Sequence, residues 1–160
     1  MSQTLAIIKP DAVGAGKAGK ILAHLENAGF AVKSLRLTVL GRAQAGAFYA
    51  VHEGRPFYDE LVEFMTSGPV IPMVLESDDA VAKLREEIGA TDPAEAADGT
   101  IRKLFAESKG RNAIHASDSD ENAASEIAFF FSGHARLRGH RPLDLGHALL
   151  QQPGQFRGPD

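Results

Sequence analysis

Short apolar runs alternate with segments of helical periodicity along this chain of 160 residues. The apolar run at 4–8 predicts a buried strand, which should end at Pro10 because proline cannot donate a hydrogen bond to a sheet. Apolar residues then recur at helical spacing from Ala18 to Leu25, and Gly29 is a suitable residue to end that helix. The length fits one compact domain.

The remaining elements continue this alternation. Further strands are expected at 30–40, where Leu35, Leu37 and Val39 alternate, at 70–75 and at 112–116, and further helices at 44–51, 58–66, 78–88, 100–105 and 120–131. Pro72 predicts an edge or a bulge in its strand, and Ser119 can cap the last of these helices. The order of elements favours an α+β fold of the ferredoxin-like sandwich type, a four-stranded antiparallel sheet with helices packed on it.

Composition excludes several classes of function. The net charge of −4 and the pI of about 5.9 give no global electrostatic attraction to nucleic acid. The chain has no cysteine, so it can form neither a disulfide nor a thiolate metal site, which agrees with a reducing, cytoplasmic location. We read no secretory signal at the start of the chain and no apolar run long enough to span a membrane.

Residues 133–160 differ in composition from the rest. They hold four arginines against two aspartates, together with five glycines, three prolines and three of the six histidines. We therefore expect a catalytic domain at 1–132 and a divergent C-terminal extension at 133–160, with a short helix at 143–150.

A glycine-rich segment at 14–20 matches the phosphate-binding pattern G-x-x-x-x-G-K. The pattern normally continues with the serine or threonine that holds Mg²⁺, and here the next residue is Ile21, which belongs to the apolar stripe of the helix. The alternative is a flexible loop followed by a helix, and we favour that interpretation.

His115 is the strongest candidate for covalent chemistry. It lies among small and polar residues, which leave room for a substrate. Neutral imidazole can attack phosphorus through one nitrogen while an acceptor holds the other. Glu126 is the candidate acceptor, and Ser117 is close enough in sequence to brace that carboxylate. A lone histidine near a strand end is also commonly structural.

Six short motifs are distributed along the chain, and their order and spacing matter as much as their residues. They are Lys9-Pro10-Asp11, Arg55-Pro56-Phe57-Tyr58, Ser67-Gly68-Pro69-Val70, Thr91-Asp92-Pro93-Ala94, Gly99-Thr100-Ile101-Arg102 and the run from Asn112 to Ser119. Together they resemble the nucleoside diphosphate kinases, over about residues 4–131. The resemblance implies a phosphotransferase that carries the γ-phosphate of a triphosphate, typically ATP, to a nucleoside diphosphate through a phosphohistidine.

The resemblance also implies roles for individual residues. Its catalytic group would be His115, Glu126, Lys9, Tyr49 and Ser117, and its nucleotide-binding group Lys9, Phe57, Leu61, Arg85, Thr91, Arg102 and Asn112. Mg²⁺ would be held mainly by the nucleotide phosphates, with Asp118 as a ligand through water. Taken singly, Tyr49 and Phe57 also fit core aromatics, Arg85 a solvated helix face and Thr91 a loop residue.

The same resemblance implies nucleoside di- and triphosphates as partners and a homo-oligomer, a tetramer or hexamer built from dimers. Two positions depart from the usual pattern, Ala116 in place of glycine and Lys109 in place of an apolar residue. Two other functions compete with this hypothesis: a regulatory nucleotide-binding protein without transferase activity, and a nucleotide hydrolase that uses Lys20.

Overall fold

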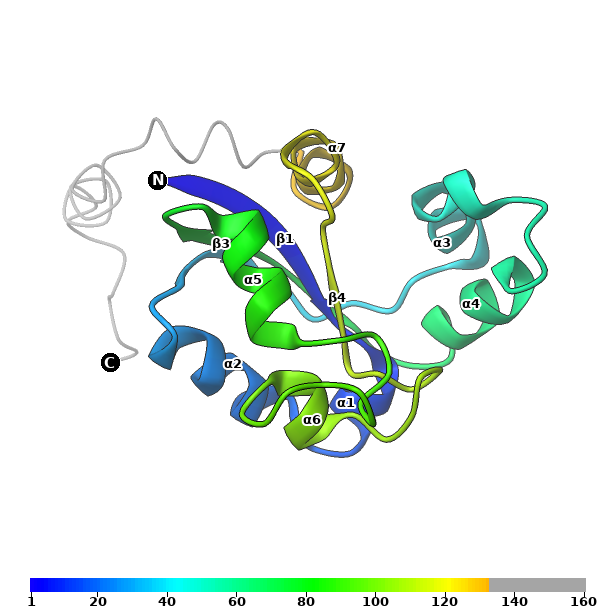
Figure 1. The fold of residues 1–160 in the computed structure, drawn as a ribbon. Helices are drawn as coiled ribbons and strands as arrows, with labels where there is room; N and C mark the ends of the chain where they lie inside the picture. Colours follow the sequence, from blue (N-terminus) through cyan, green and yellow to red (C-terminus); the bar gives the residue numbers. More distant parts are fainter. Residues whose placement is uncertain (133–160) are drawn as a thin grey trace, which may run out of the picture.

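Four strands form one antiparallel sheet in the order β2-β3-β1-β4 in the computed structural model, which describes residues 1–132 (Figure 1). The strands are β1 (Ser2–Ile8), β2 (Ala31–Leu35), β3 (Ile71–Ser77) and β4 (Ile114–Ala116). The order and the antiparallel pairing confirm the ferredoxin-like sandwich. The expected extension at 133–160 and its helix at 143–150 lie outside the described residues.

Helices cover both faces of this sheet. They are α1 (Pro10–Gly14), α2 (Ala18–Asn27), α3 (Arg42–Phe48), the short 3₁₀ helix η1 (Ala50–His52), α4 (Tyr58–Met65), α5 (Ala80–Ile88), α6 (Ile101–Phe105) and α7 (Asp120–Phe130). Figure 1 shows α3 and α4 together on the opposite side of the molecule from α2 and α5. Within the described part of the chain, no helix is both long enough and apolar enough to cross a membrane.

Strand β1 separates two hydrophobic cores. Ala6 and Ile8 pack in the core shared with α2, α5 and α6, whereas Leu5 and Ile7 pack in the core shared with α3, α4 and α7. Successive side chains of a strand point to opposite faces, so one strand with both faces buried contributes to both layers. β1 also lies between β3 and β4, which makes it the centre of the fold.

Most of the predicted helices and strands are present within one or two residues, and Ser119 caps α7 by accepting from the Asn122 N–H at 3.1 Å. Helix α1 was not predicted. Pro10 ends β1 as expected, but it also occupies the first position of α1, where its fixed φ and missing N–H suit a helix start.

The prediction of an edge or bulge at Pro72 is wrong. Strand β3 lies inside the sheet between β1 and β2, its pairing with β1 is continuous through Pro72, and the register shift in its pairing with β2 falls between Val32 and Ser34. The pairing of β2 with β3 ends at Leu35, and the Pro72 carbonyl accepts from the Arg36 N–H at 3.2 Å just beyond it. The missing N–H of the proline faces the same side, where the regular strand β2 has already ended. Beyond it, Thr38 and Val70 still exchange backbone hydrogen bonds, so the proline interrupts the pairing at one position only.

The strand expected at 30–40 is shorter, and its alternating residues do not enter the core. Leu35, Leu37 and Val39 are 44%, 64% and 62% exposed in the described structure. Alternation is a reliable sign of an extended backbone, but it does not tell which face meets the core.

The glycine-rich segment does not form a phosphate-binding loop. Helix α1 separates it from β1, whereas the phosphate-binding loop follows its strand directly. The Lys17 ammonium donates to the Phe105 carbonyl at 3.0 Å, and Lys20 is exposed on α2. The segment is the turn between two helices.

Gly89 ends α5 and brings two later elements together. Its φ of 84° is a backbone angle that residues with a side chain rarely adopt. Thr100, the cap residue of α6, fills the space that a Cβ of residue 89 would need. The Gly89 carbonyl accepts from Arg102 Nη1 at 3.1 Å. The turn therefore fixes the start of α6 and one of the predicted phosphate-binding arginines.

Replacement of Gly89 by alanine should destabilise the fold through both strain and collision. A Cβ there would lie 2.6 Å from Thr100 Oγ1 and 2.8 Å from Thr100 Cβ. Gly54→Ala is the matched control, because Gly54 has the same φ and open space around it. We expect Gly54→Ala to lower the free energy of unfolding by about 1–2 kcal/mol and Gly89→Ala by at least about 1 kcal/mol more. Denaturant titration measures both, and equal losses would contradict the role given to the Thr100 contact.

Candidate active site

His115 occupies the middle of β4, at the edge of the sheet, opposite Ile7 of β1. Its neighbours Ile114 and Ala116 are buried in the core beside α2 and α5. Alternation along the strand therefore turns His115 toward the other face, where α3 and α7 lie. The side chain is about one-fifth exposed, so solvent reaches part of the ring while the rest packs against the protein.

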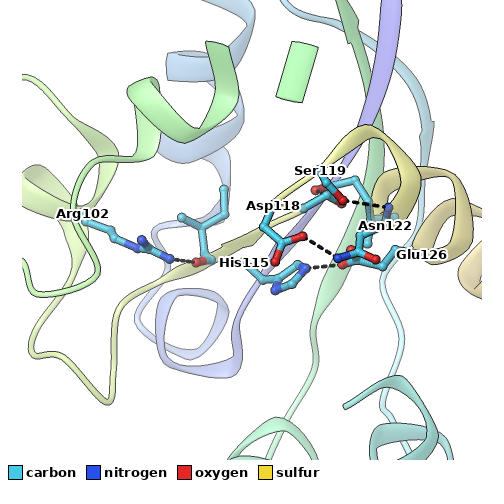
Figure 2. Close-up of polar contacts among 9 residues, drawn as sticks. Arg102, His115, Asp118, Ser119, Asn122 and Glu126 are labelled. Carbon is cyan, nitrogen blue, oxygen red and sulfur yellow. Dashed lines mark hydrogen bonds and ion pairs between the residues drawn. The ribbon is translucent and has the colours of Figure 1, made fainter. Parts of the chain in front are cut away.

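Glu126 of α7 holds one nitrogen of that imidazole. The Oε1 atom of Glu126 is in short hydrogen-bond contact with His115 Nε2, as the sequence predicted (Figure 2). Glu126 engages Nε2, so Nδ1 is the ring nitrogen outside this bond. Ser119 sets the start of α7, and Glu126 follows two turns later, so the cap determines which carboxylate meets the ring.

Aromatic rings surround the imidazole on the α3 side. The rings of Phe48 and Tyr49 approach it edge-on, with centroid distances of 5.4 Å and 6.3 Å. The Tyr49 hydroxyl is buried and has no hydrogen-bond partner among the described residues. Burial, and then the charge of Glu126, raise the pKa of Tyr49, so the phenol stays protonated and able to donate.

Ser117 does not brace Glu126 in this structure. Its buried hydroxyl instead points to the Leu5 carbonyl at 3.5 Å, across the pairing of β4 with β1. Ser117 follows β4 directly and points back into the sheet, so closeness in sequence to His115 did not bring it to the carboxylate. The geometry assigns it to the sheet rather than to the histidine.

Lys9 lies at the end of β1 and reaches toward the loop before β4. Its ammonium donates to Asn112 Oδ1 at 2.9 Å. Burial is the main reason that the pKa of Lys9 falls to about 8, and the charge of Arg102 lowers it further while Asp11 opposes the shift. The Asn112 amide also donates to the Thr91 carbonyl at 3.3 Å, which brings a third predicted residue to the same place.

Arg102 of α6 is fixed before any ligand binds. Its guanidinium donates to the Gly89 and Ile114 carbonyls at 3.1 Å and 2.8 Å, and its buried Nε has no partner in the described part of the chain. Figure 2 shows Arg102 and Glu126 on opposite sides of His115. Burial, and then the charge of Arg85, lower the pKa of Arg102 to about 10.

Arg85 and Asp118 complete the charged groups near His115. Arg85 is exposed on α5, and its charge acts on both Arg102 and Asp118. The pKa of Asp118 lies below its ordinary value, first because Asn122 Nδ2 donates to its carboxylate at 2.6 Å. Sequence reasoning did not single out Asn122, although it lies one helical turn after Asp118.

Phe57 and Leu61 mark a separate part of the site, at the start of α4. Phe57 is 45% exposed and packs against His52, with ring centroids 5.2 Å apart. Leu61 is half-buried one turn later in the helix. An exposed aromatic face of this kind can stack on a planar ligand.

No group of three or more histidine, aspartate or glutamate side chains that could hold a metal occurs within residues 1–132. Asp118 is an exposed carboxylate near His115, and its lowered pKa keeps it ionised. One exposed carboxylate cannot form an all-protein cage for Mg²⁺, but it suits an ion that arrives with several of its ligands.

The comparisons with known proteins agree on one family. The family model described as "Nucleoside diphosphate kinase" matches residues 2–135. The nucleoside diphosphate kinase of Chlorobaculum parvum is 56% identical, covering 86% of this chain and 99% of that protein, and that of Chlamydia felis is 58% identical, covering 82% and 94%.

Solved structures give the same result. The Aquifex aeolicus nucleoside diphosphate kinase superimposes with a TM-score of 0.81 at 52% identity, covering 82% of this chain and 96% of that one. A halophilic nucleoside diphosphate kinase from Halobacterium salinarum, described in complex with CDP, gives 0.78 at 41% identity, covering 81% and 87%.

The lowered pKa of Lys9 should be measurable as a titration near pH 8. A lysine with a lowered pKa is protonated below that value and neutral above it, so its positive charge should be lost as the pH rises through about 8. Arg102→Gln should move the midpoint upward, because it removes a repelling charge. Arg85→Gln is the control and should leave the Lys9 midpoint in place. NMR of ¹³C-labelled lysine side chains measures this, and a midpoint near the ordinary 10.5 would contradict the geometry.

Proposed function

The chain belongs to the nucleoside diphosphate kinase family, and on that premise we propose that it carries a phosphoryl group between nucleotides on His115. Membership makes it a phosphotransferase that acts on nucleotides. The specific proposal is a ping-pong reaction in which the γ-phosphate of a nucleoside triphosphate, typically ATP, passes to His115 and then to a nucleoside diphosphate. The observation that carries it is the bond between His115 Nε2 and Glu126, which leaves Nδ1 as the nucleophile.

In the first half-reaction, the lone pair of His115 Nδ1 attacks the γ-phosphorus. An N–P bond forms, the bond from phosphorus to the β-phosphate oxygen breaks, and the diphosphate leaves with that electron pair. Nε2 keeps its proton, and Glu126, by accepting the hydrogen bond from that N–H, would stabilise the positive charge that the ring gains. In the second half-reaction a different diphosphate attacks phosphorus, and the N–P bond breaks.

The phosphate groups require positive charge that is already in place. We propose Arg85, Arg102 and Thr91 as the residues that contact the phosphates, and Lys9 as the cation beside the transferred group. Arginine can bond two phosphate oxygens at once, and lysine supplies a compact charge. Lys9 and Arg102 have lowered pKa values in the free protein, so a polyanion should stabilise their charged forms.

The nucleoside part should rest between α4 and the loop before β4. Phe57 offers an exposed ring face, with Leu61 beside it, and a ring face reads no atom on the edge of a base. Asn112 and Lys9 would bond the sugar hydroxyls, since their side chains already meet. We therefore expect purine and pyrimidine nucleotides to be accepted, and the CDP bound to the Halobacterium relative is consistent with a pyrimidine.

Mg²⁺ is the cofactor we propose, held mostly by the phosphates of the nucleotide. It would supply charge neutralisation at those oxygens. Asp118 is the side chain we expect to contact the ion, through water. Its ionised state and its place beside His115 and Arg85 support that assignment.

In a cell, this activity would maintain the pools of nucleoside triphosphates. We place it in the cytoplasm, where a cysteine-free chain needs no oxidising environment. We also retain the division into a catalytic domain at 1–132 and a C-terminal extension at 133–160 as a proposal.

Labelling with [γ-³²P]ATP tests the phosphohistidine. The protein should acquire label on an acid-labile, base-stable bond, and unlabelled diphosphate should remove it. His115→Ala should abolish labelling, whereas Glu126→Gln should slow it by about 10²-fold because the ring loses its charged acceptor.

Two variants serve as controls for that experiment. His24→Ala removes a histidine that pairs with Glu87 and has no role in the proposed reaction, and Lys20→Ala removes the lysine of the glycine-rich segment. Both should label and turn over at the wild-type rate. Turnover by His115→Ala at that rate would refute the mechanism, and loss of turnover in Lys20→Ala would favour a hydrolase.

We further propose that the protein is a homo-oligomer, a tetramer or hexamer built from dimers. Within residues 1–132, no strand pairs with the outer edge of β2, and Leu35, Leu37 and Val39 are exposed along and just after it. Exposed strand edges with apolar side chains favour association with a second strand.

The double variant Leu37→Ser with Val39→Ser should lower the mass in solution, measured by light scattering, because it removes apolar area from this edge. Leu104→Ser is the matched control, since Leu104 is 54% exposed on α6. An unchanged mass in the double variant, or an equal loss in the control, would place the contact elsewhere.

A further inference from the structure

The residue just before β4 has a backbone conformation that alanine rarely adopts. Ala113 has φ of 72° and is completely buried. The Ile114 N–H donates to the Asn112 carbonyl at 2.9 Å, which closes a three-residue turn around Ala113. A positive φ in such a γ-turn is rare and strained, so it persists only where surrounding contacts hold it.

Those contacts come from residues more than one hundred positions earlier, at the end of β1 and the start of α1. The Ala113 N–H donates to Asp11 Oδ2 at 3.0 Å, and the Ala113 carbonyl accepts from the Lys9 N–H at 2.8 Å. Asp11 is buried, at 5% exposure, so its hydrogen bond is made away from water. Both polar groups that Ala113 presents are thus held by one short segment.

The turn lies between residues of the proposed mechanism. Asn112 is on one side, bonded to the Lys9 ammonium, and His115 is two residues away on the other. A change of backbone at Ala113 would rotate Asn112 relative to His115. Displacements of about 1 Å in such a site can cost on the order of 10²-fold in rate.

We propose that Asp11 is a positioning residue for phosphoryl transfer, because its carboxylate holds the strained turn at Ala113 that places Asn112 and His115 relative to each other. The proposal rests on the proposed function, since it concerns the same histidine. Asp11 itself touches neither nucleotide nor His115 in this scheme. Its charge has a second effect, because it opposes burial and Arg102 in keeping Lys9 protonated.

Four variants separate the turn from general stability: Asp11→Ala, Asp11→Asn, Ala113→Gly and Asp11→Ala with Ala113→Gly. Asp11→Ala removes the acceptor, and we expect single-turnover phosphorylation of His115 to slow by at least about tenfold, well below the unfolding temperature. The double variant with Ala113→Gly should be phosphorylated at least about fivefold faster than Asp11→Ala alone, because glycine adopts a positive φ without supporting contacts. Ala113→Gly alone should stay within about threefold of wild type.

Ala116→Gly in the Asp11→Ala background is the matched control. It adds a glycine three residues later, in β4, at a position without a positive φ, so it should restore nothing. Asp11→Asn keeps an acceptor and loses the charge. His115 of this variant should be phosphorylated at a rate within about threefold of wild type at pH 7. The phosphorylation rate should fall as Lys9 loses its proton at high pH, and in Asp11→Asn that fall should occur at lower pH, because Lys9 loses a favourable negative neighbour.

The outcomes divide cleanly. Wild-type speed in Asp11→Ala overturns the proposal, and so does a slow Asp11→Ala that Ala113→Gly fails to rescue. If Asp11→Ala does not fold, the double variant with Ala113→Gly must fold and be phosphorylated, and failure of either overturns the proposal.

A readout independent of activity keeps this proposal distinct from the proposed function. Hydrogen exchange of the Ala113 amide, followed by NMR, should quicken by at least about tenfold in Asp11→Ala, while the amide of Val74 in the core strand β3 stays protected. Absence of phosphoenzyme in the wild type would refute the proposed function alone. Unchanged exchange at Ala113 would refute the role of Asp11.

Discussion

The pairing of β4 with β1 is the interaction on which the site depends. It joins only three residues of β4 to the central strand, with His115 opposite Ile7. Two further backbone bonds extend it, from Lys9 to the Ala113 carbonyl and from Ser117 to the Leu5 carbonyl. Because β1 is buried on both faces, this short pairing fixes β4 on a rigid support. The imidazole is therefore positioned by the sheet, and its orientation is completed by α7.

Three cations near His115 are not paired with carboxylates within the described residues. Arg102 is bonded to carbonyl groups, Lys9 to an amide, and Arg85 repels Arg102. Each of these cations lacks an ion pair with a carboxylate among the residues that the structure describes. In the free protein the partly buried positive charges of Lys9 and Arg102 raise the free energy of the folded state, and bound phosphate groups would lower it by pairing with them.

Local signals in the sequence predicted the fold well where one residue determines one feature. Ser119 marks the start of α7, and Gly89 the end of α5, because cap chemistry acts within a few residues. Pro10 shows the limit of this reasoning, since the same ring both ends a strand and starts a helix. The exposed alternation at Leu35 and Leu37 shows another limit, because periodicity does not identify the neighbour of a face.

The site was predictable where the pattern of motifs placed residues together, as for His115 and Glu126. The bond between Asp11 and Ala113 was not predictable, because it joins residues 102 positions apart and depends on a positive φ at an alanine. Ser117 was misplaced for a related reason. It was expected beside the Glu126 carboxylate because it is near in sequence to His115, but its hydroxyl points to the Leu5 carbonyl of the neighbouring strand.

The aromatic rings beside His115 have a consequence for the fate of a phosphorylated carrier. Phe48 packs edge-on against the imidazole and also packs against Phe129 and Phe130 of α7, so a cluster of apolar rings lies beside His115. A phosphoryl group on His115 can react with any oxygen nucleophile that reaches it in line, and water is always the most abundant. If His115 carries a phosphoryl group as proposed, these rings would hinder the approach of water from their side. Loss of the phosphoryl group by hydrolysis between the two half-reactions would then be slower.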